Sequence, residues 1–221
     1  MNQVNINTLT KNIQRTLIDA QVVETPLHLC PDIKLYLLSA NNMKRHFTSD
    51  EICVVQNSTP YWSFCWASGQ AMACYILQNI KLFERKRILD FGSGSGVVAI
   101  AAAMAGAEKV VACDSDRDAI DAVRVNAMLN NVQIRTCESL HDLSHCFDMI
   151  ITADVLYDRE NHSLLEDFLT YAPEIFVADS RIKTIDVTPY QKLTEITTTT
   201  LPDLHEGDEF NHVSIYRAAL T

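Results

Sequence analysis

The sequence predicts an α/β fold built on an open, mostly parallel β-sheet, and two observations support this prediction. From Arg87 onward, short β-branched runs alternate with helical runs, and such strands and helices are joined by right-handed crossovers that cover both faces of a sheet. Near the end of the chain, two apolar runs follow each other with only a polar loop between them, which predicts an antiparallel pair at one edge. The 221 residues, 48% of them hydrophobic, suffice for one large domain with a short N-terminal addition.

Residues 1–58 are expected to form an N-terminal accessory segment of one helix and one hairpin, ahead of a main domain over residues 59–221. The stretch from Leu9 to Val22 has the spacing of a helix. The stretch LHLCPDIKLYLL, residues 27–38, alternates on both sides of a Pro-Asp turn, as a hairpin does.

Strands and helices alternate through the main domain. The expected parallel strands are RILDF (87–91), KVVACD (109–114), VQIRTC (132–137), FDMIITAD (147–154) and EIFVADS (174–180). The expected helices are ASGQAMACYILQN (67–79), GVVAIAAAMAG (96–106), DRDAIDAVRVNAMLNN (116–131) and HSLLEDFLTYA (162–172). The third of these helices ends in two asparagines, which tolerate the left-handed backbone of a helix C-terminus. EITTTTL (195–201) and HVSIYRAAL (212–220) bring the sheet to seven strands.

The charge and cysteine content of the chain indicate which partners and which compartment to expect. Eighteen basic against 28 acidic residues give a net charge of −10, which disfavours nucleic acid as a partner. The seven cysteines form no CxxC pair, which is typical of reduced thiols in a cytosolic compartment. The polar N-terminus lacks the apolar core of a secretory signal, and no charge-free apolar run is long enough to span a membrane. We therefore expect a cytoplasmic protein without membrane contact, whose oligomeric state the sequence leaves open.

A glycine-rich turn follows the first strand of the main domain. The strand ends in Asp90, and Gly92, Gly94 and Gly96 precede a helix, so the backbone can approach a ligand at the helix N-terminus. The alternative for such a turn is tight packing without a ligand; if it binds one, the ligand is a dinucleotide or S-adenosylmethionine. An acid at the strand tip would oppose a pyrophosphate but would complement an ammonium and a sulfonium, and Val97 stands where the third glycine of G-x-G-x-x-G belongs. The turn therefore favours S-adenosylmethionine.

Two further acids are candidates for the same edge of the sheet. Asp114, at the end of the next strand, has the spacing of a ribose ligand for either cofactor, and its alternative role is to cap the following helix with Ser115 or Asp116. Asp154 ends the strand FDMIITAD, and Tyr157 follows three residues later; the two could hold a nucleophile in front of the transferable methyl group. The alternative is that Asp154 caps a helix and Tyr157 packs in the core. A carboxylate opposes deprotonation of an amine, so Asp154 is assigned to capture and orientation.

The segment PYWSFCWASGQ, residues 60–70, contains both tryptophans of the chain. We interpret it as a pocket wall, with Trp66 toward the cofactor and Tyr61 or Trp62 nearer the acceptor, while core packing is the alternative for Trp62 and Tyr61. The segment HDLSHC places His141 and His145 four residues apart beside Cys146, but Asp142 replaces the glutamate of H-E-x-x-H. A solvated loop is the favoured interpretation, and no metal is predicted.

The chain resembles the seven-β-strand protein-lysine methyltransferases of family 16, and within it the branch that modifies the electron transfer flavoprotein β-subunit. Bacterial relatives of that branch are often labelled predicted nicotinamide N-methyltransferases. The resemblance rests on CWASGQAMACYIL, ILDFGSGSGVVAIAAAMAGA, VVACDSD, VRVNAMLNN and DMIITADVLYD. It implies a Rossmann-like class I methyltransferase fold that uses S-adenosylmethionine, releases S-adenosylhomocysteine and needs no metal.

The resemblance also assigns roles to residues of this chain. It implies that the cofactor is bound by Trp66, Asp90, Gly92, Ser93, Gly94, Gly96, Asp114, Ser115 and Glu138. It places Asp154 and Tyr157 near a target amine, with Tyr61 and Trp62 on the acceptor side. The leading hypothesis is methylation of lysine side chains in a protein partner. The alternatives are a small-molecule N-methyltransferase with a nicotinamide-like acceptor and an inactive, cofactor-binding interaction subunit.

Overall fold

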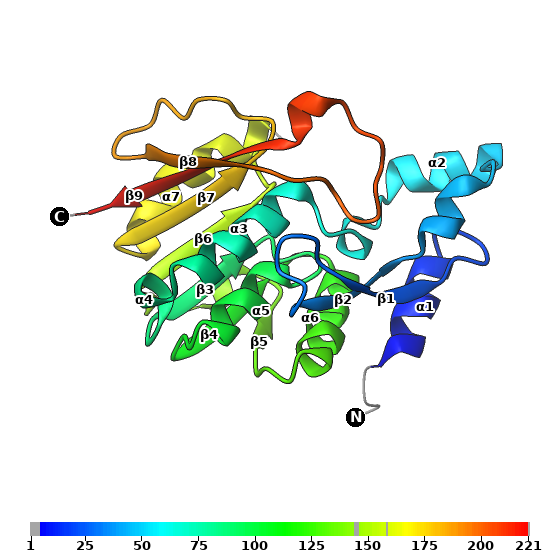
Figure 1. Cartoon of the computed structure of the whole chain (residues 1–221), viewed down its shortest axis with the longest axis horizontal. Coiled ribbons are helices and arrows are strands. Elements are labelled where there is room, and N and C mark those ends of the chain that lie inside the picture. Colours follow the sequence, from blue (N-terminus) through cyan, green and yellow to red (C-terminus); the bar gives the residue numbers. More distant parts are fainter. Residues whose placement is uncertain (1–4, 144–145, 158, 221) are drawn as a thin grey trace.

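A seven-stranded sheet forms the centre of the protein in the computed structural model, which describes residues 5–143, 146–157 and 159–220 (Figure 1). The strand order is β5-β4-β3-β6-β7-β9-β8. The bounds are β3 (Arg87–Phe91), β4 (Lys109–Cys113), β5 (Arg135–Cys137), β6 (Met149–Ala153), β7 (Glu174–Asp179), β8 (Gln191–Thr197) and β9 (His212–Ala219). Strands β3 to β7 pair in parallel, and β9 pairs antiparallel with β7 and β8. The predicted fold class is confirmed.

Helices cover both faces of this sheet because its strands are apolar on both sides. Helices α3 (Ala67–Gln78) and α5 (Val97–Met104) share one buried cluster with Ile88 of β3. Helix α7 (Leu164–Tyr171) shares the opposite cluster with Leu89, the next residue of the same strand. Helix α6 (Arg117–Leu129) lies beside α5, and the short α4 (Ile80–Phe83) follows α3. No helix within the described ranges is long and apolar enough to cross a membrane.

The N-terminal section packs against α6, at the blue end of the ribbon in Figure 1. Its elements are α1 (Ile6–Gln14), β1 (Val22–Pro26), β2 (Lys34–Leu38), the 3-10 turn η1 (Ala40–Lys44), α2 (Ser49–Asn57) and the 3-10 turn η2 (Tyr61–Ser63). The expected helix from Leu9 to Val22 is wrong in its second half, because the chain turns at Asp19 (φ 61°) and Val22 begins β1. The predicted hairpin is present, but residues 27–33 form its loop, closed by a hydrogen bond from Leu27 N to Ile33 O.

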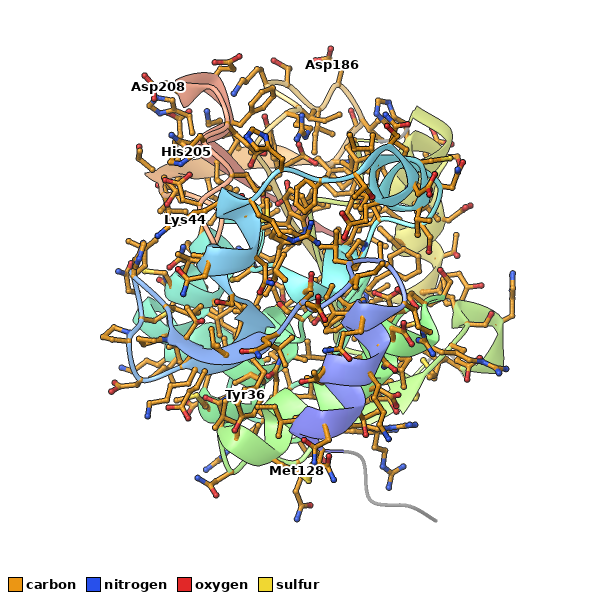
Figure 2. The ribbon with its side chains drawn as sticks, turned by 90° about the vertical axis from the view of Figure 1, so that its right-hand side faces the viewer. Tyr36, Lys44, Met128, Asp186, His205 and Asp208 are labelled. Carbon is orange, nitrogen blue, oxygen red and sulfur yellow. The ribbon has the colours of Figure 1, made fainter. Side chains whose placement is uncertain are left out.

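Asn126 of α6 and Asn130, the C-cap of this helix, hold the hairpin against the main domain through hydrogen bonds. Asn126 Oδ1 accepts a hydrogen bond from Tyr36 N (2.7 Å), and Asn126 Nδ2 donates to the carbonyl of Ser95 in the glycine turn (2.9 Å). Asn130 exchanges two hydrogen bonds with the backbone of Lys34 (3.0 and 2.6 Å). Figure 2 labels Tyr36 of β2 and Met128 of α6 in this region of the molecule. The predicted boundary between the accessory segment and the main domain, after residue 58, stays a prediction.

The C-terminal strand pair differs from the expected pair in one strand. Strand β9 lies where HVSIYRAAL predicts it, whereas β8 begins at Gln191 and ends at Thr197 instead of spanning residues 195–201. Beyond β8 the chain leaves the sheet, and Leu201 pairs with Cys65 ahead of α3 through backbone hydrogen bonds of 2.7 and 2.8 Å. The loop of residues 198–211, which contains the 3-10 turn η5 (Asp208–Phe210), therefore lies against the start of α3.

Candidate active site

A cavity of about 1100 Å³ lies at the carboxyl ends of the parallel strands, where open α/β sheets bind ligands. Ten of the predicted site residues line it: Tyr61, Trp62, Trp66, Gly92, Gly94, Asp114, Ser115, Glu138, Asp154 and Tyr157. Three predicted residues of the glycine turn, Asp90, Ser93 and Gly96, are not among its lining residues. Segments far apart in the sequence therefore meet at one edge of the sheet, as the alternation of strands and helices predicts.

The glycine turn presents backbone to this cavity. Gly92 and Gly94 have φ angles of 70° and 48°, in the left-handed region where side chains are disfavoured. A Cβ atom on Gly92 would lie 2.4 Å from Val155 Cγ1, so the close approach of the β6 end requires glycine. A Cβ atom on Gly94 would meet no atom within 4 Å. The turn therefore leaves open space at Gly94 for a ligand that approaches the backbone.

Asp90 lies beneath the turn. Its carboxylate is buried and accepts a hydrogen bond from Ala99 N of α5 (3.0 Å). Burial, together with the charge of Asp114, raises the pKa of Asp90 to about 7. Ser93 Oγ is also buried and has no hydrogen-bond partner in the described part of the chain. The predicted contacts of Asp90, Ser93 and Gly96 with a cofactor stay predictions.

Asp114 and Glu138 line the end of the cavity beside β4 and β5. Asp114 Oδ2 accepts from Gly94 N (2.8 Å) and Oδ1 accepts from Asp116 N (3.0 Å), so the carboxylate orients the glycine turn. Burial raises the pKa of Asp114. The cap of α6 is Asp116, whose side chain accepts from Asp118 N. Glu138 forms an exposed ion pair with Arg117 (3.1 Å).

Asp154 is held rigidly at the N-terminus of α3. Its φ angle of 54° is unusual for a residue with a side chain, and its backbone N–H donates to Ala178 O (3.1 Å). The carboxylate accepts from Ser68 Oγ (2.6 Å), from Ser68 N (3.2 Å) and from Ser180 Oγ (3.3 Å). Burial raises the pKa of Asp154 to about 6, and the nearby Asp179 adds to the rise, while the bonds from Ser68 and Ser180 oppose it. These three hydrogen bonds therefore hold the carboxylate in one orientation at the cavity wall.

Aromatic rings form the wall next to Asp154. The rings of Tyr61 and Tyr157 lie 5.8 Å apart, and each residue is about half exposed (46% and 53%). Tyr61 is also 5.8 Å from Trp66, whose indole N–H donates to Tyr61 O (3.1 Å). Trp62 is only 1% exposed and packs in a buried cluster with Leu9. Trp62 is therefore a core residue that also forms part of the cavity wall. Its role in substrate binding stays a prediction.

Several polar residues at or near the cavity belong to no recognisable sequence motif and are not among the predicted site residues. Gln70 is fully buried: its Oε1 accepts from His28 N (2.7 Å), and its Nε2 donates to Thr199 O (2.9 Å). The available signal is a polar Gln70 among the small residues that begin α3. The cavity also contains Ser180, Arg181, Thr200 and Glu206. Ser180 and Arg181 follow β7 at the same edge of the sheet, whereas Thr200 and Glu206 depend on how residues 198–211 fold back, which local sequence patterns do not indicate.

The structure describes only part of the segment HDLSHC. His141 lines the cavity, His145 lies outside the described residues, and no group of three or more His, Cys, Asp or Glu residues in the described ranges is arranged to hold a metal ion.

The residues that line the cavity fit S-adenosylmethionine. Open space at Gly94 accommodates a ligand against the turn, and the carboxylates of Asp114 and Glu138 can accept hydrogen bonds from an adenosine moiety. The carboxylate of Asp154 and the rings of Tyr61 and Trp66 suit the cationic methionine end and a cationic acceptor.

Known proteins resemble the chain in sequence and in fold. The ribosomal protein L11 methyltransferase (PrmA) family profile matches residues 70–164. The electron transfer flavoprotein beta subunit lysine methyltransferase of Mus musculus is 34% identical over 159 residues, which cover 68% of this chain and 61% of the mouse protein. The zebrafish (Danio rerio) protein of the same name is 30% identical over 176 residues, covering 76% of this chain and 67% of the relative. The chain thus spans about three fifths of the length of the first of these relatives.

Solved structures resemble the chain in fold alone. A magnesium protoporphyrin IX methyltransferase from Synechocystis with bound SAM is 17% identical and covers 70% of this chain and 80% of its own (TM-score 0.54). A ribosomal protein L11 methylase from Lactobacillus delbrueckii is 18% identical and covers 70% and 79% (TM-score 0.53). The sequence identities to the mouse and zebrafish proteins confirm the resemblance seen in the sequence. The chain belongs to the family of S-adenosylmethionine-dependent methyltransferases that includes the electron transfer flavoprotein beta subunit lysine methyltransferases.

Proposed function

We propose that the protein transfers a methyl group from S-adenosylmethionine to a lysine side chain of a protein acceptor. The observation that carries this proposal is the carboxylate of Asp154, fixed by Ser68 and Ser180 beside the half-exposed rings of Tyr61 and Tyr157. A carboxylate at an open aromatic mouth suits a cation on a long side chain that remains attached to its own protein.

When bound, S-adenosylmethionine supplies the methyl carbon of its sulfonium, which the acceptor nitrogen takes as the carbon–sulfur bond breaks. The chain contributes mainly alignment, because a methyl transfer of this kind requires a nucleophile held in line with the bond that breaks. Asp114 orients the glycine turn through Gly94 N, and Asp154 receives the lysine ammonium. Both carboxylates are therefore positioning groups, one after β4 and the other after β6.

The lysine must lose a proton before its nitrogen can attack. An ionised Asp154 captures the ammonium but by itself raises the pKa of the lysine. The apolar faces of Tyr61 and Tyr157 act in the opposite direction, because they remove water from the amine and so disfavour its charged form. The released proton can pass to water at the open mouth, and the same rings contact the methylated cation favourably.

The names of the relatives support the electron transfer flavoprotein β-subunit as the acceptor. The net charge of −10 also favours a basic acceptor surface over a nucleic acid. To test the proposal, the purified protein would be incubated with labelled S-adenosylmethionine and, separately, with electron transfer flavoprotein, a cell extract and a set of pyridines. We expect label in protein, at lysine by mass spectrometry. Label confined to pyridines, or no label at all, would refute the proposal.

Asp154→Asn tests the assigned role of the carboxylate. The amide keeps the shape and can still accept from Ser68, but it cannot pair with an ammonium. We expect kcat/KM for the protein acceptor to fall about 100-fold, the order expected when one partner of a buried charge pair is removed, with little change in cofactor affinity. Asp203→Asn, an exposed acid outside the cavity lining, is the matched control. Undiminished transfer by Asp154→Asn would show that the assignment is wrong.

A further inference from the structure

The loop of residues 198–211 brings a second carboxylate to the cavity in which Asp154 is proposed to bind the acceptor lysine. Two contacts hold the start of this loop: Leu201 pairs with Cys65, and Gln70 Nε2 donates to Thr199 O (2.9 Å). Figure 2 shows His205 and Asp208 where the loop reaches the outer surface. Glu206 lies between them in sequence and lines the cavity. The loop therefore presents one acid inward and leaves its neighbours in solvent.

Glu206 is tied to the same helix end as Asp154. Ser68 N donates to Asp154 Oδ2 (3.2 Å), and the preceding N–H of α3, that of Ala67, donates to Thr200 Oγ1 (3.3 Å). Thr200 Oγ1 in turn donates to Glu206 Oε2 (3.0 Å). Two carboxylates are thus held by consecutive N–H groups of one helix, one directly and one through a single hydroxyl.

Arg181 neutralises Glu206 in the structure. Its guanidinium lies 3.0 Å from Glu206 Oε1 and 4.3 Å above the centre of the Phe210 ring. Among the described residues that line the cavity, Arg181 is the only arginine or lysine. The Arg181 side chain is 41% exposed, so water reaches this ion pair and another cation can take the place of Arg181.

Glu206 is better suited to a second cation than to the target lysine. Two carboxylates on one ammonium would both hold the proton that must leave before methyl transfer, which opposes the reaction. A basic side chain next to the target lysine has no such constraint, because it stays charged throughout.

We propose that Glu206 binds a basic side chain of the acceptor that flanks the target lysine, and that Arg181 competes with this side chain for the carboxylate. This inference rests on the proposed function and adds a specificity determinant to it. If the ion pair were purely structural, it would only hold the loop in place. Removal of either Glu206 or Arg181 would then change stability and acceptor KM in the same direction.

The test compares Glu206→Gln, Arg181→Gln and the control Glu209→Gln, an exposed acid of the same loop that does not line the cavity. Rates with labelled S-adenosylmethionine and purified electron transfer flavoprotein give KM and kcat for each variant. We expect Glu206→Gln to raise the acceptor KM about tenfold with kcat nearly unchanged, as for loss of a charge contact made equally in ground and transition states. Arg181→Gln should lower the acceptor KM about threefold, because it removes the competing cation. The control should match the wild type.

A double-mutant cycle identifies the cation that is bound. In the acceptor, each Lys or Arg that flanks the labelled lysine is changed to Gln, and one such change should raise the wild-type KM about tenfold while abolishing the effect of Glu206→Gln.

Two results would overturn the inference: an unchanged acceptor KM for Glu206→Gln, or a higher KM with a lower melting temperature for both Glu206→Gln and Arg181→Gln. Absence of label in the acceptor with the wild-type enzyme would instead refute the proposed function, and this inference with it. The wild-type reaction in the same assay separates the two failures.

Discussion

Asn126→Ala is expected to destabilise the protein strongly, because one buried amide connects the hairpin, α6 and the glycine turn. Asn126 is 0% exposed and pairs with Tyr36 N and with Ser95 O at 2.7 and 2.9 Å. The variant leaves both backbone groups without a partner, and each such group costs about 1–3 kcal/mol when water cannot reach it. Since Ser95 is buried and Tyr36 only partly so, we expect the free energy of unfolding to fall by about 2–4 kcal/mol.

Asn130→Ala is a matched control from the C-cap of the same helix. Asn130 makes a similar pair of bonds to the backbone of Lys34 and also donates to Asn126 O (2.7 Å), but Asn130 and Lys34 reach solvent, so water can replace the amide at a cost below about 1 kcal/mol. Urea unfolding followed by circular dichroism would measure both losses. Titration calorimetry would show whether Asn126→Ala also weakens S-adenosylmethionine binding, as expected if the Ser95 carbonyl steadies the turn. Equal losses for the two variants would refute the reasoning.

Further predictions concern the cavity. Trp66→Ala should weaken S-adenosylmethionine binding more than Trp62→Ala, whereas Trp62→Ala should cost about 3–5 kcal/mol of stability because Trp62 is core; calorimetry and urea unfolding would reveal a reversed order. Gly92→Ala should lower stability by about 1–3 kcal/mol through its clash, whereas Gly94→Ala meets no clash and should lower stability less, through its left-handed backbone alone, while reducing cofactor affinity; the same two measurements compare them. The pKa of Asp154 rises from 3.8 to about 6 on folding, so its contribution to the free energy of unfolding falls as pH rises between these values. Asp154→Asn should therefore gain stability relative to the wild type between pH 4 and pH 7, by at most about 3 kcal/mol, and a pH-independent difference in unfolding curves would contradict this.

The sheet could be predicted because its strands and helices carry strong periodicity, while several element ends could not, among them the ends of α1 and β8. Leu17 and Ala20 stay buried after α1 has ended, so helical spacing continues past the turn at Asp19. The threonine run after Glu195 has high strand propensity along its whole length, and nothing local marks Thr197 as the last residue of β8. The end of that strand depends on the pairing of Leu201 with Cys65, which is a long-range contact.

The candidate site could be predicted in part for the same physical reason. Asp114 and Asp154 follow parallel strands, and the carboxyl ends of such strands meet at one edge, so their approach follows from topology. Composition alone does not indicate which tryptophan is core, because α6 and the hairpin strand β2, which lie elsewhere in the chain, pack against the turn that contains Trp62. Glu206 and Arg181 meet only because a C-terminal loop folds back toward α3.

Gln70 has a consequence for protein engineering. Its single amide supports the turn of the N-terminal hairpin through His28 and the acceptor-side loop through Thr199. Consider a chimera that takes only residues 198–211 from a relative with another acceptor. Its new loop would pack against the Gln70 and hairpin turn of this chain, which match the original loop. Exchange of specificity between members of this family should therefore transplant the hairpin turn, the α3 glutamine and the C-terminal loop as one unit.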